Sequence, residues 1–322
     1  MLKLASFFAG VGGIDEGFKL TKHFKTVYAN EFDPYPAKVY ETNFPISVDL
    51  RDIHSVEPED IPDVDCIVGG FPCTSFSIAG YRKGFEDERT GDLFFEIARL
   101  IKAKHPKYIF LENVKNLVSH DGGKTFHIIL DCLGSMGYHV KYKVMNAAEY
   151  GNIPHGRERI YIVGFLNESE YDAFEFPEPA ALNTKLSDVV DFHSRQADKY
   201  YYTPEKCKFY DTLVRDMTSQ NTVYQWRRRY VRSNKSGVCP TLTANMGTGG
   251  HNVPLILADH GIRKLTPRET FNIQGFPSEF VLPSDMSDAR LYKCAGNSVV
   301  VPVIRRIAEA ILDAIEKCHK NQ

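Results

Sequence analysis

Short apolar segments alternate with amphipathic segments along the first half of the chain. Apolar, β-rich runs lie at residues 2–9, 26–31, 64–70, 108–114 and 139–146. Helix-like periodicity lies between them, near residues 34–43, 92–104 and 121–136. This alternation predicts an α/β domain with a parallel sheet covered by helices on both faces. Ligands of such sheets bind beyond the carboxyl ends of the strands, so the residues after each run are the first candidates for a site.

The pattern changes in the second half of the chain. A run at 159–165 follows the run at 139–146 after a turn-rich stretch, which predicts a paired antiparallel edge. From about residue 177 to 262, prolines and polar clusters replace clear periodicity. Apolar positions 303, 307, 311 and 315 then follow Pro302 and predict an amphipathic helix over 303–317.

Composition places the chain among ordinary globular proteins. Its 322 residues are 43% apolar and 25% charged, which excludes fibrous and disordered classes. No run approaches the roughly 18–20 apolar residues of a membrane span, and no signal-peptide pattern opens the chain. We therefore expect a cytoplasmic protein with no membrane partner. Seven scattered cysteines without a C-x-x-C pair predict free thiols, and neither a disulfide framework nor a bound metal.

Charge separates the middle of the chain from the rest. Residues 179–262 contain eleven Lys and Arg against seven Asp and Glu, a net charge of +4, although the whole chain carries −2. We predict a large domain of residues 1–178 and 263–322, interrupted by a smaller basic domain of residues 179–262. Arginines interleaved with aromatic residues suit phosphate contacts and base recognition, although a solvated charged face is the alternative. The candidate arginines are Arg227, Arg228, Arg229 and Arg232.

Three successive strand ends offer groups that suit a nucleoside. The first run ends in a glycine-rich turn over 10–13, which alone fits a tight structural turn as well as a cofactor loop. The second ends at Glu31, where a carboxylate can hold ribose hydroxyls, and Phe32 can pack on an adenine. Asp52 and Ile53 follow a presumed third strand at the same edge.

Later strand ends carry reactive groups. Cys73 follows Pro72 at a strand end and precedes a glycine-punctuated stretch, as a nucleophile on a loop would, whereas Cys66, Cys132 and Cys294 lie in apolar runs typical of packing cysteines. Glu112 ends the next strand, where burial disfavours its charged form and suits a proton donor.

Two further pairs of polar residues close the set of candidates. Arg157 and Arg159 have the i, i+2 spacing that directs both to one side of an extended segment. Asn297 and Ser298 precede the last helix, where they can bind a ligand or cap the helix.

The ordered motifs resemble the bacterial DNA (cytosine-5)-methyltransferase family, the modification enzymes of restriction–modification systems. The matching segments are FAGVGG, NEFD, GGFPCTSFS, FLENVKNL, HGRERIYIVGF, LTPRETFNIQGFP and AGNSVVVPVI. The resemblance implies a Rossmann-like S-adenosylmethionine-dependent methyltransferase sheet, and a target-recognition domain at residues 179–262. It implies double-stranded DNA as the partner, and S-adenosylhomocysteine as the product of the cofactor. We expect a monomer and a cognate restriction endonuclease that need not bind it.

The same resemblance implies roles for the reactive residues. Cys73 would add to C6 of a cytosine flipped out of the duplex, while Glu112 protonates N3. Arg159, and with less support Arg157, would stabilise the bound base. The sequence names no side chain that removes the C5 proton, a step for which water suffices. A loop from Thr74 to Asp92, with Ser77 in it, would close over the base, and Thr241 would brace the DNA nearby.

The resemblance also implies a set of cofactor-binding residues. They are Phe8, Gly10, Gly12, Gly13, Glu31, Phe32, Asp52, Ile53, Pro72, Leu93, Asn297 and Ser298. One position departs from the family, because His155 stands where the family usually has Gln; we expect it in a surface loop.

Other classes fit less well. Amino-group methyltransferases use an Asp/Asn/Ser-Pro-Pro-aromatic motif, where this chain has Phe-Pro-Cys. A transfer-RNA cytosine-5 methyltransferase shares Cys73 and Glu112 but has a Cys-Phe-Thr signature that is absent here. A nicotinamide oxidoreductase leaves Cys73 unexplained, and a catalytically silent DNA-binding protein would be expected to lose the nucleophile or the acid. The sequence does not give the DNA site that is recognised.

Overall fold

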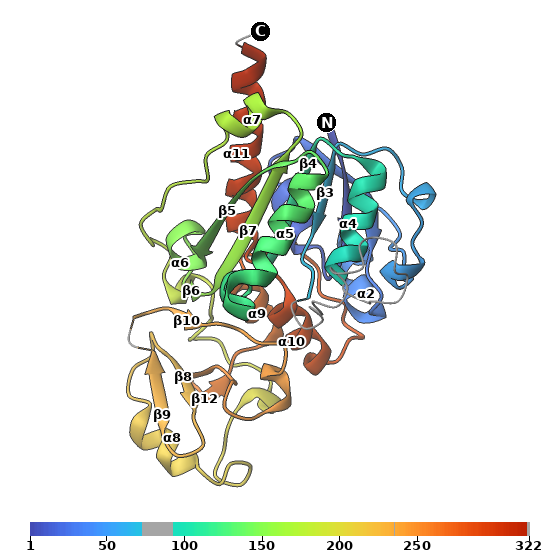
Figure 1. Cartoon of the computed structure of the whole chain (residues 1–322). Helices are drawn as coiled ribbons and strands as arrows, with labels where there is room; N and C mark the ends of the chain where they lie inside the picture. Colours follow the sequence, from blue (N-terminus) through green and yellow to red (C-terminus); the bar gives the residue numbers. More distant parts are fainter. Residues whose placement is uncertain (73–92, 235, 321–322) are drawn as a thin grey trace. The chain divides into compact units, whose positions relative to one another are not determined.

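The computed structural model describes residues 1–72, 93–234 and 236–320 (Figure 1). Contacts between Cα atoms divide the chain into two compact units. Unit 1 consists of Met1–Met145, Glu158–Glu178 and Val303–Gln322, and unit 2 consists of Asn146–Arg157 and Pro179–Pro302. Among the residues described, no helix combines the length and apolar character that a membrane crossing requires.

Unit 1 is built on a six-stranded sheet with the order β2-β1-β3-β4-β7-β5. Its strands are β1 (Leu2–Phe7), β2 (Phe24–Asn30), β3 (Cys66–Gly69), β4 (Tyr108–Val114), β5 (His139–Asn146) and β7 (Glu158–Phe165). Strand β1 runs parallel to β2 and β3, and β3 runs parallel to β4. Strand β7 lies between β4 and β5 and runs antiparallel to β4. The predicted parallel sheet is confirmed, and the runs at 139–146 and 159–165 lie next to each other at one edge of it as β5 and β7, with β5 outermost.

Helices cover both faces of this sheet. They are α1 (Gly13–Lys19), α2 (Pro34–Asn43), α4 (Leu93–Lys104), α5 (Lys124–Ser135), α7 (Glu168–Ala173) and α11 (Val301–Lys320), with 3-10 turns η1 (Ile53–Ser55), η2 (Pro58–Asp60) and η4 (Lys115–Gly123). Leu111 of β4 packs in one apolar cluster with Ile97 of α4 and Ile129 of α5. Its neighbour Phe110 faces the other way and contacts Phe18 of α1, with ring centroids 5.4 Å apart. Because successive side chains of β4 point to opposite faces of the sheet, this one strand contributes apolar residues to both faces.

Two local predictions in unit 1 need correction. The presumed third strand before Asp52 is an isolated bridge between Asn30 and Asp49. Backbone hydrogen bonds join Asp49 to Ala29 and Glu31, and the Asn30 side chain donates further hydrogen bonds to the carbonyls of Asp49 and Arg51. The predicted helix at 121–136 begins only at Lys124, because residues 121–123 adopt positive φ angles.

Unit 2 contains a second sheet with the order β12-β11-β8-β9. Its strands are β8 (Val223–Trp226), β9 (Val231–Asn234), β11 (Leu255–Ala258) and β12 (Gly261–Lys264), and a separate parallel pair joins β6 (His155–Gly156) to β10 (Cys239–Pro240). The helical elements are α6 (Ala147–Tyr150), α8 (Tyr210–Asp216), α9 (Pro267–Ile273), α10 (Asp288–Asn297), η5 (Leu186–Asp188), η6 (Asp198–Tyr200) and η7 (Met246–Thr248). Tyr224, Leu255 and Ile262 form part of its apolar core.

The compact units do not follow the predicted domain limits at every point. Unit 2 also takes in residues 146–157 and 263–302. The second segment is held there because β12 continues the β11 hairpin and the buried Arg263 guanidinium forms an ion pair of 2.7 Å with Glu269 of α9. The assignment of residues 179–262 to DNA recognition stays a prediction.

Candidate active site

The loop after β1 has the backbone geometry of a close ligand approach. Phe8, Gly10 and Gly12 have φ angles of 52°, 56° and 85°. At Gly12 a Cβ atom would lie 2.3 Å from a ring carbon of Phe44, so this position requires glycine. A positive φ at Phe8 is unusual for a bulky residue and is characteristic of functional loops. Gly13 then begins α1.

Glu31 ties this loop to the end of β2. One carboxylate oxygen accepts a hydrogen bond of 2.9 Å from the Gly10 backbone N–H, and the other accepts one of 2.9 Å from Asp33. The adjacent Phe32 side chain is 67% exposed. A carboxylate and an open aromatic face therefore stand side by side next to the glycine-rich loop, which fits a ligand that has a ribose and a flat apolar ring.

Asp52 and Ile53 lie on the turn η1, and only one of them is open to solvent. The Asp52 carboxylate caps η1 by accepting a hydrogen bond from the His54 backbone, and contacts with the His54 backbone and ring lower the pKa of Asp52. The Ile53 side chain is 3% exposed and belongs to the apolar cluster under the sheet. Of the two residues expected to flank an adenine, Phe32 and Ile53, the structure thus leaves only Phe32 with an open face.

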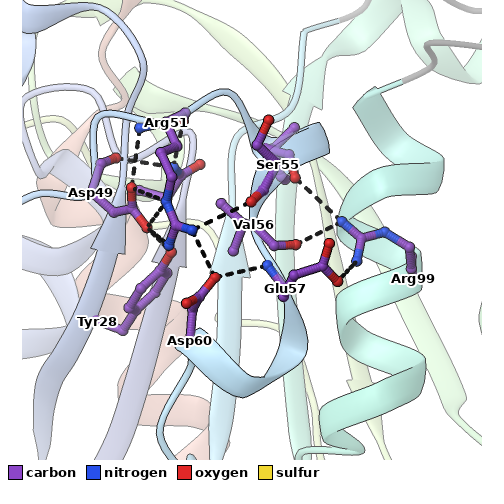
Figure 2. Close-up of polar contacts among 10 residues, drawn as sticks. Tyr28, Asp49, Arg51, Ser55, Val56, Glu57, Asp60 and Arg99 are labelled. Carbon is purple, nitrogen blue, oxygen red and sulfur yellow. Dashed lines mark hydrogen bonds and ion pairs between the residues drawn. The ribbon is translucent and has the colours of Figure 1, made fainter.

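Arg99 of α4 holds the backbone of this segment, and sequence reasoning missed it. Its guanidinium donates hydrogen bonds to the carbonyls of Ile53 at 3.3 Å and Val56 at 2.8 Å, as Figure 2 shows for Val56. Its Nε donates to Glu96 at 2.9 Å. Arg99 stands on the helical face that an amphipathic pattern assigns to solvent, so the sequence held no signal for this contact.

A second arginine supports the same segment from the other side. Arg51 forms ion pairs with Asp49 at 2.6 Å and with Asp60 at 2.9 Å, and Tyr28 of β2 donates to Asp49 at 2.7 Å (Figure 2). The hydrogen bonds from Arg51 lower the pKa of Asp49 to about 2. Residues 49–60, which contain the expected cofactor residues, are therefore braced by charged side chains at both ends.

The end of β4 and the start of β7 bring the acid and an arginine together. Glu112 and Arg159 lie on the antiparallel strands β4 and β7, and Arg159 Nε is 3.0 Å from Glu112 Oε1. A Cβ at Gly70 would lie 3.4 Å from the other oxygen of Glu112. Asn113 donates a hydrogen bond of 2.8 Å to the carbonyl of Phe71. The carboxyl thus lies beside the chain that leads to Pro72.

The nucleophile predicted from the sequence lies outside the described residues. Cys73 and Ser77 belong to the segment 73–92, which the structure does not describe. On either side of it, Pro72 is exposed and Leu93, the first residue of α4, packs against the apolar cluster. The expected packing cysteines Cys66, Cys132 and Cys294 are buried. Burial raises the pKa of the Cys132 thiol to about 11, which makes it a poor nucleophile at neutral pH.

His155 is not a surface residue, which corrects the prediction from the sequence. Its side chain is fully buried, and its Nε2 accepts a hydrogen bond of 3.1 Å from the backbone N–H of Leu242. Next to it, Thr241 Oγ1 donates to the carbonyl of Gly156 at 2.6 Å. The parallel pairing of β6 with β10 brings these residues together, and residues so distant in sequence give no local signal of it.

The two candidate arginines have different partners. The Arg157 guanidinium is buried and donates hydrogen bonds to the backbone carbonyls of Leu242, Gly296 and Ser298, at 3.1, 3.2 and 2.5 Å. Arg159 pairs with Glu112. The Arg157 guanidinium thus supports the backbone of unit 2, whereas the Arg159 guanidinium lies beside the Glu112 carboxyl.

Ser298 offers a polar atom to a ligand. It follows α10, and its Oγ is buried without a hydrogen-bond partner in the part of the chain that the structure describes. Its neighbour Asn297 is exposed. A buried hydroxyl of this kind is expected to have a partner, so the site is suited to a polar group of a bound molecule.

Comparison with known proteins finds matches along nearly the whole chain. A model of the family described as C-5 cytosine-specific DNA methylase matches residues 2–313. The Type II methyltransferase M.Bsp6I of Bacillus sp. (strain RFL6) is 61% identical over 311 residues, covering 97% of this chain and 98% of that protein. The Type II methyltransferase M.HaeII of Haemophilus aegyptius is 40% identical over 314 residues, covering 97% and 93%.

Solved structures share the fold at much lower sequence identity. The Entamoeba histolytica methyltransferase EhMeth superposes with a TM-score of 0.71 at 18% identity, covering 98% of this chain and 99% of that one. The S. pombe Dnmt2 methyltransferase gives a TM-score of 0.72 at 17% identity, covering 100% and 99%. At such identities the likeness concerns the fold alone.

Proposed function

The chain belongs to the family of C-5 cytosine-specific DNA methylases, and from this premise we propose that it methylates a flipped-out cytosine through a covalent bond to Cys73. It is a DNA cytosine-5 methyltransferase of the type II kind, with S-adenosylmethionine as the family's cofactor. The observation that carries the proposal is the contact between Glu112 and Arg159 beside Gly70, next to the backbone that leads to Cys73.

The proposed roles follow from the chemistry of the cytosine ring. C5 of cytosine is a poor nucleophile, so the Cys73 thiolate adds to C6 while Glu112 delivers a proton to N3, and negative charge does not build up on the ring. Arg159 keeps the Glu112 side chain in place, stabilises the bound base and favours the thiolate form of Cys73. C5 then takes the methyl group and the C5 proton passes to a base. The bond between Cys73 and C6 breaks, the thiolate leaves, and N3 returns its proton to Glu112. The target must leave the stacked duplex for these contacts to form.

The residues at the edge of the sheet fit the cofactor. S-adenosylmethionine supplies the methyl group when bound. Glu31 would hold its ribose, Phe32 would cover the adenine and Asp52 would accept a hydrogen bond from the adenine amino group. The positive φ angles at Phe8, Gly10 and Gly12 let the backbone approach the ligand, and the buried Ser298 hydroxyl needs a polar partner. The other proposed cofactor residues are Gly13, Ile53, Pro72, Leu93 and Asn297.

Residues 179–262 are the proposed target-recognition domain. Within it, Thr241 would brace the DNA near the flipped nucleotide, and its hydrogen bond to Gly156 supports a fixed position. Ser77 would contact the DNA from the other segment. We propose that the enzyme acts as a monomer on double-stranded DNA and protects host DNA from a cognate restriction endonuclease.

Bisulfite sequencing of a random-sequence DNA library tests the proposal. The library is incubated with the protein and S-adenosylmethionine, and methylated cytosines are mapped. C5 methylation in one short sequence context is the expected result, and it also identifies the recognition site. Methyl transfer to transfer RNA without transfer to DNA would overturn the proposal in favour of a transfer-RNA enzyme, and transfer to neither would point to a silent DNA-binding protein.

A further inference from the structure

Strand alternation in unit 2 divides the run of arginines into two groups. The hairpin of β8 and β9 pairs Gln225 directly with Arg232. Arg227 lies two residues after Gln225, and Asn234 lies two residues after Arg232. Side chains along a strand alternate between its two faces, so these four side chains belong to one face of the hairpin. These four residues, together with Thr241 and Asn252, line a pocket of about 390 Å³. We call it the polar pocket.

The opposite face of the hairpin is apolar. Trp226 stacks on Phe209 with ring centroids 4.3 Å apart and an interplanar angle of 3°. Arg228, at the turn between the strands, has a positive φ of 69° and lines a different pocket with these rings. Arg229 is exposed and lines neither pocket among the residues described. The four arginines that the sequence groups together therefore do not share one surface.

The polar pocket carries side chains that distinguish base edges. Arginine makes paired hydrogen bonds to guanine, and Asn or Gln makes them to adenine. No carboxylate stands among its described lining residues, so the two arginines give it a positive charge. The Arg227 guanidinium donates to the His251 carbonyl at 3.3 Å, which fixes its direction.

Arg232 is available to a ligand. Its side chain is exposed, and within the described part of the chain no hydrogen bond or ion pair occupies its guanidinium. Gln225, its cross-strand partner, is 5% exposed. An arginine with a free guanidinium that pairs across the hairpin with an amide side chain is suited to read one base pair.

The polar pocket is also anchored to the element that we expect near the flipped nucleotide. Thr241 lines it and is tied to Gly156, and Arg157 and His155 hold Leu242. Each of these contacts lies within unit 2. These contacts keep the polar pocket in a fixed position relative to Thr241.

We propose that the polar pocket reads the base edges of the DNA target through Arg227, Arg232 and Gln225, whereas Arg228 and Arg229 contact only phosphates. This proposal rests on the proposed function, because it assumes that residues 179–262 recognise DNA. It assigns sequence specificity to one face of one hairpin.

Methylation profiles of two arginine variants test it. Arg232→Ala and Arg229→Ala are each compared with the unchanged protein by bisulfite sequencing of a random-sequence library. Arg232→Ala is expected to lose about 5- to 150-fold discrimination at one base pair and to keep the other positions of the site. Arg229→Ala is expected to lower methylation of all sequences by one common factor and to reduce the salt slope of DNA binding by about 1.

The outcomes separate this proposal from the proposed function. A uniform loss for Arg232→Ala, or a changed context for Arg229→Ala, would overturn the proposal. No C5 methylation by the unchanged protein would instead contradict the proposed function. Gln225→Ala provides a second variant, expected to relax the same base pair or its neighbour, and S-adenosylmethionine binding by each variant verifies the fold.

Discussion

Arg159 Nε lies 3.0 Å from Glu112 Oε1, and both side chains are at most 14% exposed. The strands β4 and β7 hold the pair in place, so the carboxyl has a fixed direction before any substrate arrives. The pair therefore fixes an acid–base group at the end of β4.

Replacing Glu112 by Gln should slow methyl transfer. The amide has the same size but cannot carry the proton to N3, so kcat should fall by about 10²- to 10⁴-fold. The affinity for S-adenosylmethionine should stay the same, because Glu112 does not belong to the expected cofactor residues. Single-turnover transfer of a labelled methyl group and a cofactor titration measure the two quantities.

Arg159→Lys is the matched variant for this pair. Lysine keeps the positive charge but loses the planar guanidinium that holds the carboxyl direction, so an intermediate loss in kcat is expected. If Glu112→Gln retained full turnover, proton delivery by Glu112 would be excluded.

Replacing Cys73 by Ser should abolish methylation and leave binding intact. A serine hydroxyl is not ionised at neutral pH and does not add to C6, whereas it occupies nearly the same volume as the thiol. Binding of DNA is measured by fluorescence anisotropy and turnover by methyl incorporation. Cys132→Ala is the control, because that thiol is buried and its pKa is raised to about 11. Turnover at the original rate in the serine variant would disprove covalent catalysis by Cys73.

Sequence patterns predicted the parts of this site that are local. Glu31 and the loop at Gly10 were expected near each other because both follow strands of a parallel sheet, and a hydrogen bond of 2.9 Å joins them. Glu112 was expected at a strand end and lies there. Strand period and chain order suffice for such predictions, since neighbouring parallel strands end at one edge.

Contacts between distant segments were not predictable in the same way. His155 was expected at the surface because a polar residue in a turn-rich segment is usually solvated, yet pairing of β6 with β10 buries it. The carbonyls held by Arg99 lie 43 and 46 residues away in the sequence, and any cation on α4 would give the same pattern. The strands β8, β9, β11 and β12 of unit 2 contain only four residues each, too few to show a clear period.

Replacing Arg99 by Met should weaken cofactor binding. The variant loses the hydrogen bonds that hold the carbonyls of Ile53 and Val56, so the segment next to Asp52 has to be ordered when the ligand binds. We expect a rise of about 10-fold in the Kd and KM for S-adenosylmethionine with little change in kcat at saturation. Isothermal titration measures the Kd, and steady-state kinetics measure the KM and the kcat.

Lys102→Met is the control for Arg99, because Lys102 is an exposed cation on the same helix. It should leave the cofactor affinity unchanged. A loss of kcat without a change in KM for Arg99→Met would contradict a positioning role toward the cofactor segment.

Asp15 gives unit 1 a dependence of stability on pH. Its buried carboxylate accepts hydrogen bonds from the hydroxyls of Ser6 and Thr26 at 2.8 Å and of Tyr40 at 3.0 Å, and so connects α1 to β1, β2 and α2. Burial raises the pKa of Asp15 above its ordinary value, although the three hydrogen bonds oppose the shift. The folded chain therefore binds this proton more tightly than the unfolded chain does.

Replacing Asp15 by Asn should remove that dependence. As the pH rises from about 4 through the raised pKa, the native protein has to ionise a buried carboxyl, so the unchanged protein loses free energy of unfolding relative to Asp15→Asn. The variant stays neutral throughout and keeps an oxygen that accepts hydrogen bonds from the same hydroxyls. Urea unfolding of both proteins at several pH values between 4 and 8 measures the difference. It should grow in favour of the variant as the pH increases, and two curves that stay parallel would show that Asp15 has the same pKa in the folded and unfolded chain.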